Sequence, residues 1–145
     1  MPTTEIRVLT AADIMSAPVV TADLNESPIV ARARMRAWGV RHLVLVHGGV
    51  CAGVVDDRSV LSAWRHSPLG VRHPTLAGLR RTTTTCVLPV ADVKMVARVM
   101  TAGRVDAVPV VDADGVLLGL VTAGDVAAAV ARFGVSVGEE AACGL

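Results

Sequence analysis

The sequence predicts an α+β fold made of two similar units that pack into one module. An internal repeat supports this prediction, because residues 39–46 resemble residues 104–111, which lie 65 positions later. Each copy shows the same order of strand and helix patterns, and its strands are nearly continuous apolar runs, which is typical of sheets covered on both faces. A unit of about 60 residues is marginal alone, so the two copies are expected to cover each other.

Each unit is predicted to contain two helices. Residues 27–38 form the first helix of the first unit, because Ser27 is a favourable N-cap, Pro28 takes the first helical position and Gly39 follows the end. A further helix is expected after each hairpin, over residues 59–64 and over residues 125–132.

Each unit is also predicted to contain a hairpin preceded by a separate strand. In the first unit, β-branched runs at 42–46 and 50–55 flank a His-Gly-Gly turn whose glycines are expected to have positive φ. The order in each unit is therefore strand, helix, strand, strand, helix. The second hairpin is expected at 107–111 and 116–121, and the separate opening strands at 19–21 and 84–86.

The repeat also divides the chain. The first unit with its N-terminal lead-in is expected at residues 1–73 and the second unit at residues 74–135. Residues 136–145 lack apolar periodicity and are expected to be a flexible tail.

Composition excludes several classes of protein. Of the 145 residues, 52% are hydrophobic and 19% are charged, which excludes wholesale disorder. The chain has no Tyr, one Phe and two Trp, so stacking surfaces for nucleic acid are nearly absent and no nucleic-acid partner is expected. Charged residues or glycines interrupt every apolar stretch before the roughly 18 residues that span a bilayer, so no membrane association is expected. The N-terminus lacks a secretory signal pattern, which favours the cytoplasm.

Charge and cysteine usage add two further expectations. Residues 1–81 hold 10 Arg against 6 acids, whereas residues 82–145 hold 4 Lys or Arg against 7 acids, so the halves carry +4 and −3. The three cysteines Cys51, Cys86 and Cys143 have no C-x-x-C spacing, which predicts buried free thiols and neither a disulfide framework nor a zinc knuckle.

The passage from a buried strand into a helix at residues 119–126 is the strongest chemical feature. Thr122 offers a hydroxyl, and Asp125 places a carboxylate in the first helical turn. That carboxylate could accept both hydroxyls of a ribose, while the free amides of a helix start favour an anion. The same Thr-x-x-Asp pattern is also a capping box, in which the two side chains only stabilise the helix end. Both interpretations remain open on this pattern alone.

These features, found in order and twice, resemble the paired cystathionine β-synthase (CBS) domain, also called the Bateman module. The resemblance covers roughly residues 9–133 and implies two β-α-β-β-α units packed by pseudo-two-fold symmetry. Its motifs are the Asp-Ile-Met lead-in at 13–15, the strand at 108–112, the Asp-Gly turn at 114–115 and the Gly-h-h-Thr-x-x-Asp end at 119–125.

The resemblance implies a regulatory module whose cleft binds an adenosine-containing ligand: AMP, ADP, ATP or S-adenosylmethionine. The nucleotide is then a regulatory ligand, and no cofactor is required. The family's ribose- or phosphate-binding Thr and acid fall on Thr122 and Asp125. Positions that match its adenine contacts are Thr84, Thr85, Cys86, Ala107 and Pro109. A homodimer and an effector protein that senses occupancy are the expected partners.

The first unit departs from this pattern, because Asp56 and Ser59 stand where Thr and Asp are expected. Asp56 would repel a phosphate, and Ser59 would either reach a ribose hydroxyl or cap the helix. In the second unit Ala123 and Gly124, beside the helix start, carry no basic group, so phosphate contacts must come from elsewhere, with Arg41, His42 and residues 80–81 as candidates. A possible second site consists of Val20, Thr21, His42, Asp56 and Ser59.

Other functions receive less support from the sequence. Catalysis needs a nucleophile with a base or paired acids in a cleft, and the adjacent acids at 56–57 diverge at a strand end, so no enzyme is expected. His66 and His73 are too isolated for a zinc set, so no metal is expected. Cys86 either senses oxidation or is an inert small hydrophobe. The alternative from another class is a ligand-free interaction or dimerisation scaffold with vestigial clefts.

Overall fold

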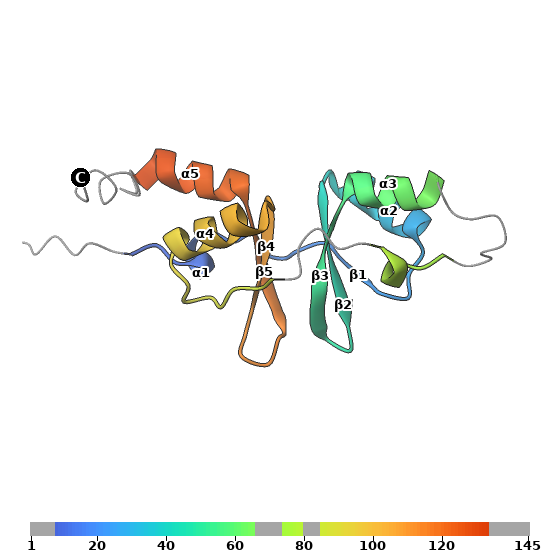
Figure 1. Cartoon of the computed structure of the whole chain (residues 1–145), viewed down its shortest axis with the longest axis horizontal. Coiled ribbons are helices and arrows are strands. Elements are labelled where there is room, and N and C mark those ends of the chain that lie inside the picture. Colours follow the sequence, from blue (N-terminus) through green and yellow to red (C-terminus); the bar gives the residue numbers. More distant parts are fainter. Residues whose placement is uncertain (1–7, 66–73, 80–84, 134–145) are drawn as a thin grey trace, which may run out of the picture.

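The structure is a computed structural model that describes residues 8–65, 74–79 and 85–133. It has two α+β units whose sheets face each other and whose helices lie on the outer sides (Figure 1). The expectations for Thr84, His66, His73, Cys143, residues 80–81 and the tail at 136–145 lie outside the described residues. No described helix has the length and apolar character needed to cross a membrane.

The first unit contains a three-stranded sheet in the order β1-β2-β3. Strand β1 runs parallel to β2, and β2 runs antiparallel to β3. The helix between β1 and β2 and the helix after β3 pack against each other on one side of this sheet. The elements are β1 (Thr21–Asp23), α2 (Pro28–Trp38), β2 (His42–His47), β3 (Val50–Asp56) and α3 (Asp57–Arg65).

The second unit repeats this plan with a shorter opening strand. Strands β4 and β5 form an antiparallel pair, and Val87 alone forms a parallel bridge to Val110 on β4. In the first unit the Leu24 amide donates to Val46 and helps to extend β1. Its counterpart 65 positions later is Pro89, which has no amide hydrogen for that bond. The elements are α4 (Val93–Gly103), β4 (Ala107–Val111), β5 (Leu117–Thr122) and α5 (Ala123–Phe133).

The predicted helix at 27–38 is confirmed. The Ser27 hydroxyl accepts a hydrogen bond of 3.3 Å from the Val30 amide, and Gly39 ends the helix with φ at +63°. The helices that follow the hairpins begin two residues earlier than predicted, at Asp57 and Ala123, because the residue before each of them is the N-cap.

The predicted turns are confirmed as well. Gly48 and Gly49, between β2 and β3, have φ of +57° and +79°. In the second hairpin Gly115 has φ of +83°, and the Asp112 carboxylate accepts hydrogen bonds from the Asp114 and Val116 amides. Positive φ is the reason that glycine occupies these positions.

The lead-in segments cross between the units. Helix α1 (Ala11–Ile14) packs on the second unit, where the Ala11 amide donates to Ala91 at 2.7 Å and Ala12 donates to Pro89 at 3.0 Å. Residues 74–79, which include the short 3-10 helix η1 (Leu76–Gly78), pack on the first unit through equivalent bonds to Glu26 and Leu24. Each lead-in thus packs on the unit that does not follow it directly in the sequence, while the division of the chain at residue 73 stays a prediction.

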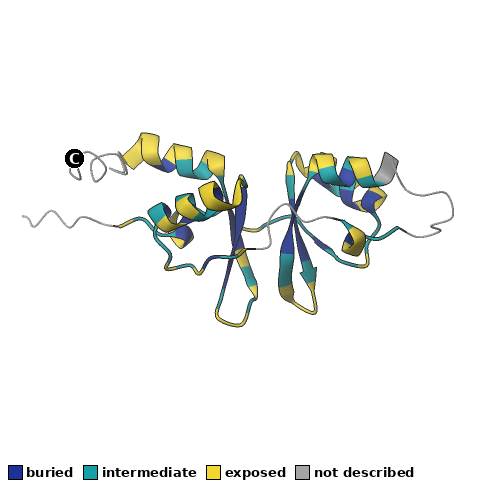
Figure 2. Ribbon diagram, viewed as in Figure 1, coloured by how far each residue is buried: buried dark blue, intermediate teal, exposed yellow. Residues whose placement is uncertain are grey.

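A shared apolar layer joins the units. Each unit has its own core, and a third cluster, made of Val44, Val54, Ala107 and Leu120, lies between the two sheets. All five residues of β4 are buried, so the prediction of strands covered on both faces is confirmed there. Buried residues follow the facing strands of both units in Figure 2. The isolated bridge between Val50 and Val116 adds a direct backbone contact between the hairpins.

Candidate functional site

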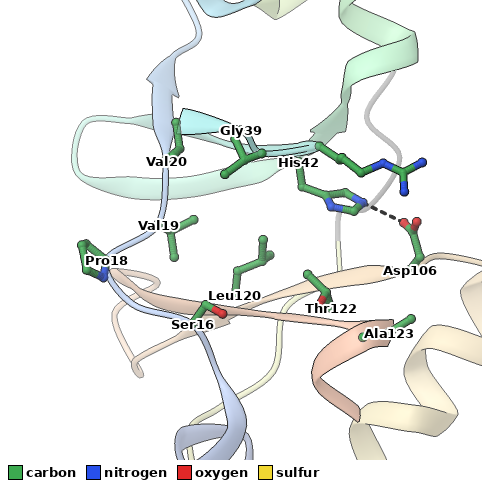
Figure 3. Close-up of a pocket in the computed structure, with 13 residues that line it drawn as sticks. Ser16, Pro18, Val19, Val20, Gly39, His42, Asp106, Leu120, Thr122 and Ala123 are labelled. Carbon is green, nitrogen blue, oxygen red and sulfur yellow. Dashed lines mark hydrogen bonds and ion pairs between the residues drawn. The ribbon is translucent and has the colours of Figure 1, made fainter. Parts of the chain in front are cut away.

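A cavity of about 510 Å³ lies between the two units. Its walls come from the segment that leads into β1, from the turn between α2 and β2, and from the junction of β5 with α5 (Figure 3). The lining residues are Ser16, Pro18, Val19, Val20, Gly39, Val40, Arg41, His42, Asp106, Leu120, Thr122, Ala123 and Gly124. A cavity of this volume is in the range of small-molecule sites.

Thr122 provides a hydroxyl to the cavity from the end of β5. Its backbone amide and its hydroxyl both donate to Asp125 Oδ2, at 2.8 and 3.0 Å, and the Asp125 amide approaches Thr122 Oγ1 at 3.3 Å. The capping box that the sequence predicted as one interpretation is therefore formed. Asp125 Oδ1 takes no part in these three bonds, so the cap and a ligand contact by the same carboxylate are compatible.

The first unit contributes the opposite wall. Gly39 has left-handed geometry, which turns the chain sharply from α2 toward β2 and places residues 40–42 along the cavity. His42 is a largely enclosed polar group there, with 15% of its side chain exposed. Its Nε2 lies 3.0 Å from Asp106 Oδ1, across the gap between the units (Figure 3).

The walls combine apolar surface with a few polar groups. Val19, Val20, Val40 and Leu120 supply apolar area for a flat ring, while the hydroxyl of Thr122 can hydrogen-bond a polar substituent. Arg41 adds a positive charge to the cavity lining. The acidic side chain of the lining, Asp106, is paired with His42. The arrangement suits a ligand that has an apolar ring, hydroxyl groups and an anionic end.

The cavity brings together residues that the sequence analysis had assigned to two separate sites. Thr122, from one predicted set, lines the same cavity as Val20 and His42, from the other set. Asp125 does not itself line the cavity, but its Oδ2 accepts a hydrogen bond from the hydroxyl of Thr122, which does. Among the described residues, the lining set does not include Thr85, Cys86, Ala107 and Pro109, nor Thr21, Asp56 and Ser59.

Several predicted residues outside the lining set have structural roles. Asp56 is the cap of α3, because its Oδ1 accepts a 2.7 Å hydrogen bond from the Ser59 amide. Ser59 is thus the donor of this cap, not the capping side chain. The carbonyl of Thr21 accepts from Arg34 at 2.7 Å, while Ala107 and Pro109 are buried in β4.

Sequence reasoning missed several wall residues. Ser16, Pro18 and Val19 belong to the crossing segment, whose position follows from the packing of α1 on the second unit. Asp106 belongs to no motif, and Leu120 entered the sequence analysis only as an apolar position of the motif at 119–125. The only usable signal was the repeat itself, since Asp106 occupies the position of Arg41 in the other copy and therefore lies at the equivalent edge. No group of three or more His, Cys, Asp or Glu side chains that could hold a metal occurs in the described part of the chain.

The fold and the cavity define a tandem module of two related units with a ligand-sized cleft between them. The family model described as CBS domain matches residues 11–66 and residues 79–132, which together are more than half of the chain. The protein therefore belongs to the CBS domain family, as its sequence resemblance implied. No curated protein matches it significantly.

Solved structures of CBS domain pairs share the whole fold. The CBS domain pair of protein MJ0100, in complex with 5′-methylthioadenosine and S-adenosyl-L-methionine, is 24% identical, with a TM-score of 0.73, 84% of this chain covered and 95% of that chain covered. CBSX2 in complex with AMP is 21% identical, with a TM-score of 0.75 and coverages of 87% and 98%. Hypoxic Response Protein I with two coordinated zinc ions is 28% identical, with a TM-score of 0.71 and coverages of 82% and 97%.

Proposed function

We propose that this protein is a regulatory module that binds an adenosine-containing ligand in the cavity between its two units. One observation carries the proposal: the cavity joins the Thr122 hydroxyl of the second unit to the apolar wall and the basic residues of the first unit. The complexes of MJ0100 and CBSX2, which contain adenosine compounds, support the choice of ligand class.

The proposed pose follows the chemistry of the walls. The adenine lies against Val20 and Val40, where burial of a flat ring is favourable. The ribose hydroxyls meet Thr122 and the carboxylate of Asp125, which is the acceptor that a diol prefers. A phosphate or another anionic end extends toward Arg41, since its guanidinium is a strong donor to phosphate oxygens. This pose uses one composite site and leaves no role for a separate site at Asp56 and Ser59.

Occupancy would act through the arrangement of the two units. A ligand that touches both walls favours the relative orientation in which both contacts are made. The hydrogen bond between His42 and Asp106 crosses the same gap, so it responds to the same movement. We propose that an effector protein recognises this orientation. We also propose that the protein has no catalytic function.

A homodimer is the smallest assembly that we propose. Several apolar side chains on the outer helices are exposed, such as Ile29 at 56% and Trp38 at 71% on α2 and Phe133 at 59% on α5. Burial of these side chains against a second copy would stabilise an assembly. Sedimentation equilibrium gives the mass directly, and a monomer at all concentrations would contradict the dimer.

The ligand proposal is tested by thermal unfolding with millimolar AMP, ADP, ATP, S-adenosylmethionine or NAD. At 100 times its Kd, a ligand adds about 2.7 kcal/mol of stability, which corresponds to a rise in Tm of roughly 5–10 °C for a chain of this length. We expect such a rise with at least one compound, and we expect Asp125→Asn to abolish most of it. Asparagine retains an oxygen that accepts from Thr122, so the helix cap survives while the negative charge at the ribose is lost.

Asp92→Asn is the matched control, because Asp92 caps α4 through a 2.7 Å bond from the Met95 amide and does not line the cavity. It should leave the ligand-induced shift unchanged. The alternative function, a ligand-free scaffold, is favoured by the complete capping box at Thr122. It would be supported if no compound shifts the Tm, or if both variants change it equally.

A further inference from the structure

Two cysteines that are 35 positions apart in the sequence meet at the junction of the units. Cys51 lies in β3 of the first unit, and Cys86 precedes Val87 at the opening of the second unit. Their thiols interact with each other across this junction, where Cys51 also packs against the apolar layer between the two sheets. Sequence analysis expected buried thiols, but both residues are only partly buried, so small reagents can reach them.

Backbone contacts hold both cysteines in place. The Cys51 amide donates to Gly115 at 3.0 Å, beside the bridge between Val50 and Val116. Next to Cys86, Val87 donates to Pro109 at 3.0 Å and accepts from Val111 at 2.9 Å. The Cys51 backbone is therefore bonded to the β4–β5 turn of the second unit, and the residue next to Cys86 is bonded to β4.

We propose that Cys51 and Cys86 form a reversible disulfide that joins the two units, through exchange with a small-molecule disulfide such as oxidised glutathione. The proposal does not depend on ligand binding in the cavity. Two free thiols that interact directly are placed to form an S–S bond, whose length is roughly 2.05 Å, once the sulfur atoms move together. Because the residues come from different units, the new bond would fix the relative position of β3 and the opening segment of the second unit.

Thiol–disulfide exchange supplies the chemistry in two steps. The Cys51 thiolate attacks one sulfur of the small disulfide, whose S–S bond breaks and releases one thiolate. Cys86 then gives its proton to solvent and attacks Cys51 Sγ, which forms the Cys51–Cys86 bond and releases the second thiolate. The two protein thiols are oxidised by two electrons, and the small disulfide is reduced to two thiols.

The electrostatics of the pair favour Cys51 as the attacking group. The hydrogen bond from Cys86, assisted by the Gly53 amide, lowers the pKa of Cys51 to about 7, although burial of the thiol acts in the opposite direction. The pKa of Cys86 is raised, because its hydrogen bond to Cys51 retains the shared proton and burial disfavours a second thiolate. A thiol with a pKa near the ambient pH is the most effective nucleophile in exchange.

The test uses the full chain with Cys143→Ser, so that only the two cysteines of interest remain. The protein is incubated with oxidised glutathione, blocked with a thiol reagent and measured by intact mass and peptide mapping. We expect a monomer that has lost two hydrogens, with Cys51 and Cys86 in one linked peptide pair, and full reversal by dithiothreitol. Mixed disulfides with glutathione on both cysteines, or only intermolecular products, would overturn the proposal.

Two single variants in the Cys143→Ser background test the order of events. Cys86→Ser should stop at a stable glutathione adduct on Cys51, whereas Cys51→Ser should react much more slowly at Cys86. Labelling of Cys51 by iodoacetamide should rise as the pH rises through about 7, and its midpoint should move upward in Cys86→Ser, which lacks the thiol donor. An unchanged midpoint, or equal reactivity of both single variants, would contradict the roles assigned to the two thiols.

Discussion

At the scale of single residues, Gly119 shows how tightly the crossing segment approaches the second unit. Gly119 lies in the middle of β5, and a Cβ there would meet the side chain of Met15 and the carbonyl oxygen of Ser16, the latter at 3.0 Å. Ser16 and Leu120 exchange backbone hydrogen bonds of 2.9 and 3.1 Å, so the crossing segment cannot move away from β5 without breaking them. The absence of a side chain at Gly119 is therefore a packing requirement.

Gly119→Ala should destabilise the protein by about 1–3 kcal/mol, because overpacking must displace Met15 or break the pairing of Ser16. Urea unfolding followed by circular dichroism measures the change. Gly103→Ala is the control, since a Cβ at Gly103, in the last turn of α4, would make only ordinary contacts with Val105 at 3.6 Å and beyond. Equal stability of the two variants would show that β5 does not need the close approach.

At the scale of elements, the two equivalent helices end with the same backbone geometry but with different residues. Helix α2 ends at Gly39 with φ of +63°, and α4 ends at Arg104 with φ of +52°. In both helices the amide of the C-cap residue donates to a carbonyl of the last helical turn. The amide of the next residue donates to the carbonyl of the buried methionine, which is Met35 in α2 and Met100 in α4. The left-handed geometry is thus set by the fold, and Arg104 adopts it without the freedom of glycine.

Arg104→Gly should therefore stabilise the protein, because an L-residue in left-handed geometry costs about 1–2 kcal/mol and part of this cost is regained. The net gain should be about 0.5–1 kcal/mol, since glycine also makes the unfolded chain more flexible. Gly39→Ala should do the opposite and destabilise by about 1 kcal/mol. Chemical denaturation of both variants measures the pair of effects, and a loss of stability in Arg104→Gly would contradict the argument.

Local patterns were sufficient to predict most elements. Caps, glycines and β-branched runs are short-range signals, so α2 and both hairpins were placed within a residue or two. The opening strands were placed too early, at 19–21 and 84–86, whereas β1 spans Thr21–Asp23 and the parallel bridge of the second unit is at Val87. The starts of α3 and α5 were placed late, because Asp56 and Thr122 end a strand and cap a helix at the same position.

At the scale of the whole molecule, the repeat predicted the pairing of units but not the composition of the cavity. The repeat shows which residues are equivalent, whereas the site depends on which edge of one copy meets which edge of the other. Thr122 was therefore grouped with Cys86 and Pro109 of its own unit, although the cavity combines it with Val20 and His42. The same ambiguity applies to the N-terminal lead-in, which packs on the second unit although the first unit follows it in the sequence.

The crossing of the lead-ins gives the last prediction, through two equivalent residues. Ala11 is fully buried in the core of the second unit, and Leu76, 65 positions later, is fully buried in the core of the first. Leu76→Ala should cost about 2–5 kcal/mol, and Ala11→Gly should cost about 1–2 kcal/mol through the lost methyl group and helix propensity. Ala11 packs in the second unit and Leu76 in the first, so each substitution should first destabilise the unit in which the residue is buried.

Native-state hydrogen exchange resolves where the loosening occurs. Ala11→Gly should accelerate exchange in α4 and α5, and Leu76→Ala should accelerate it in α2 and β2. The opposite assignment, in which each change loosens the unit next to it in the sequence, would mean that the lead-ins do not cross. The crossing matters for the proposed regulation, because the segment between Ala11 and Thr21 packs on the second unit, lines the cavity and then enters the sheet of the first. A ligand in the cavity would thus contact a covalent segment that joins the two units and must shift whenever they change their relative orientation.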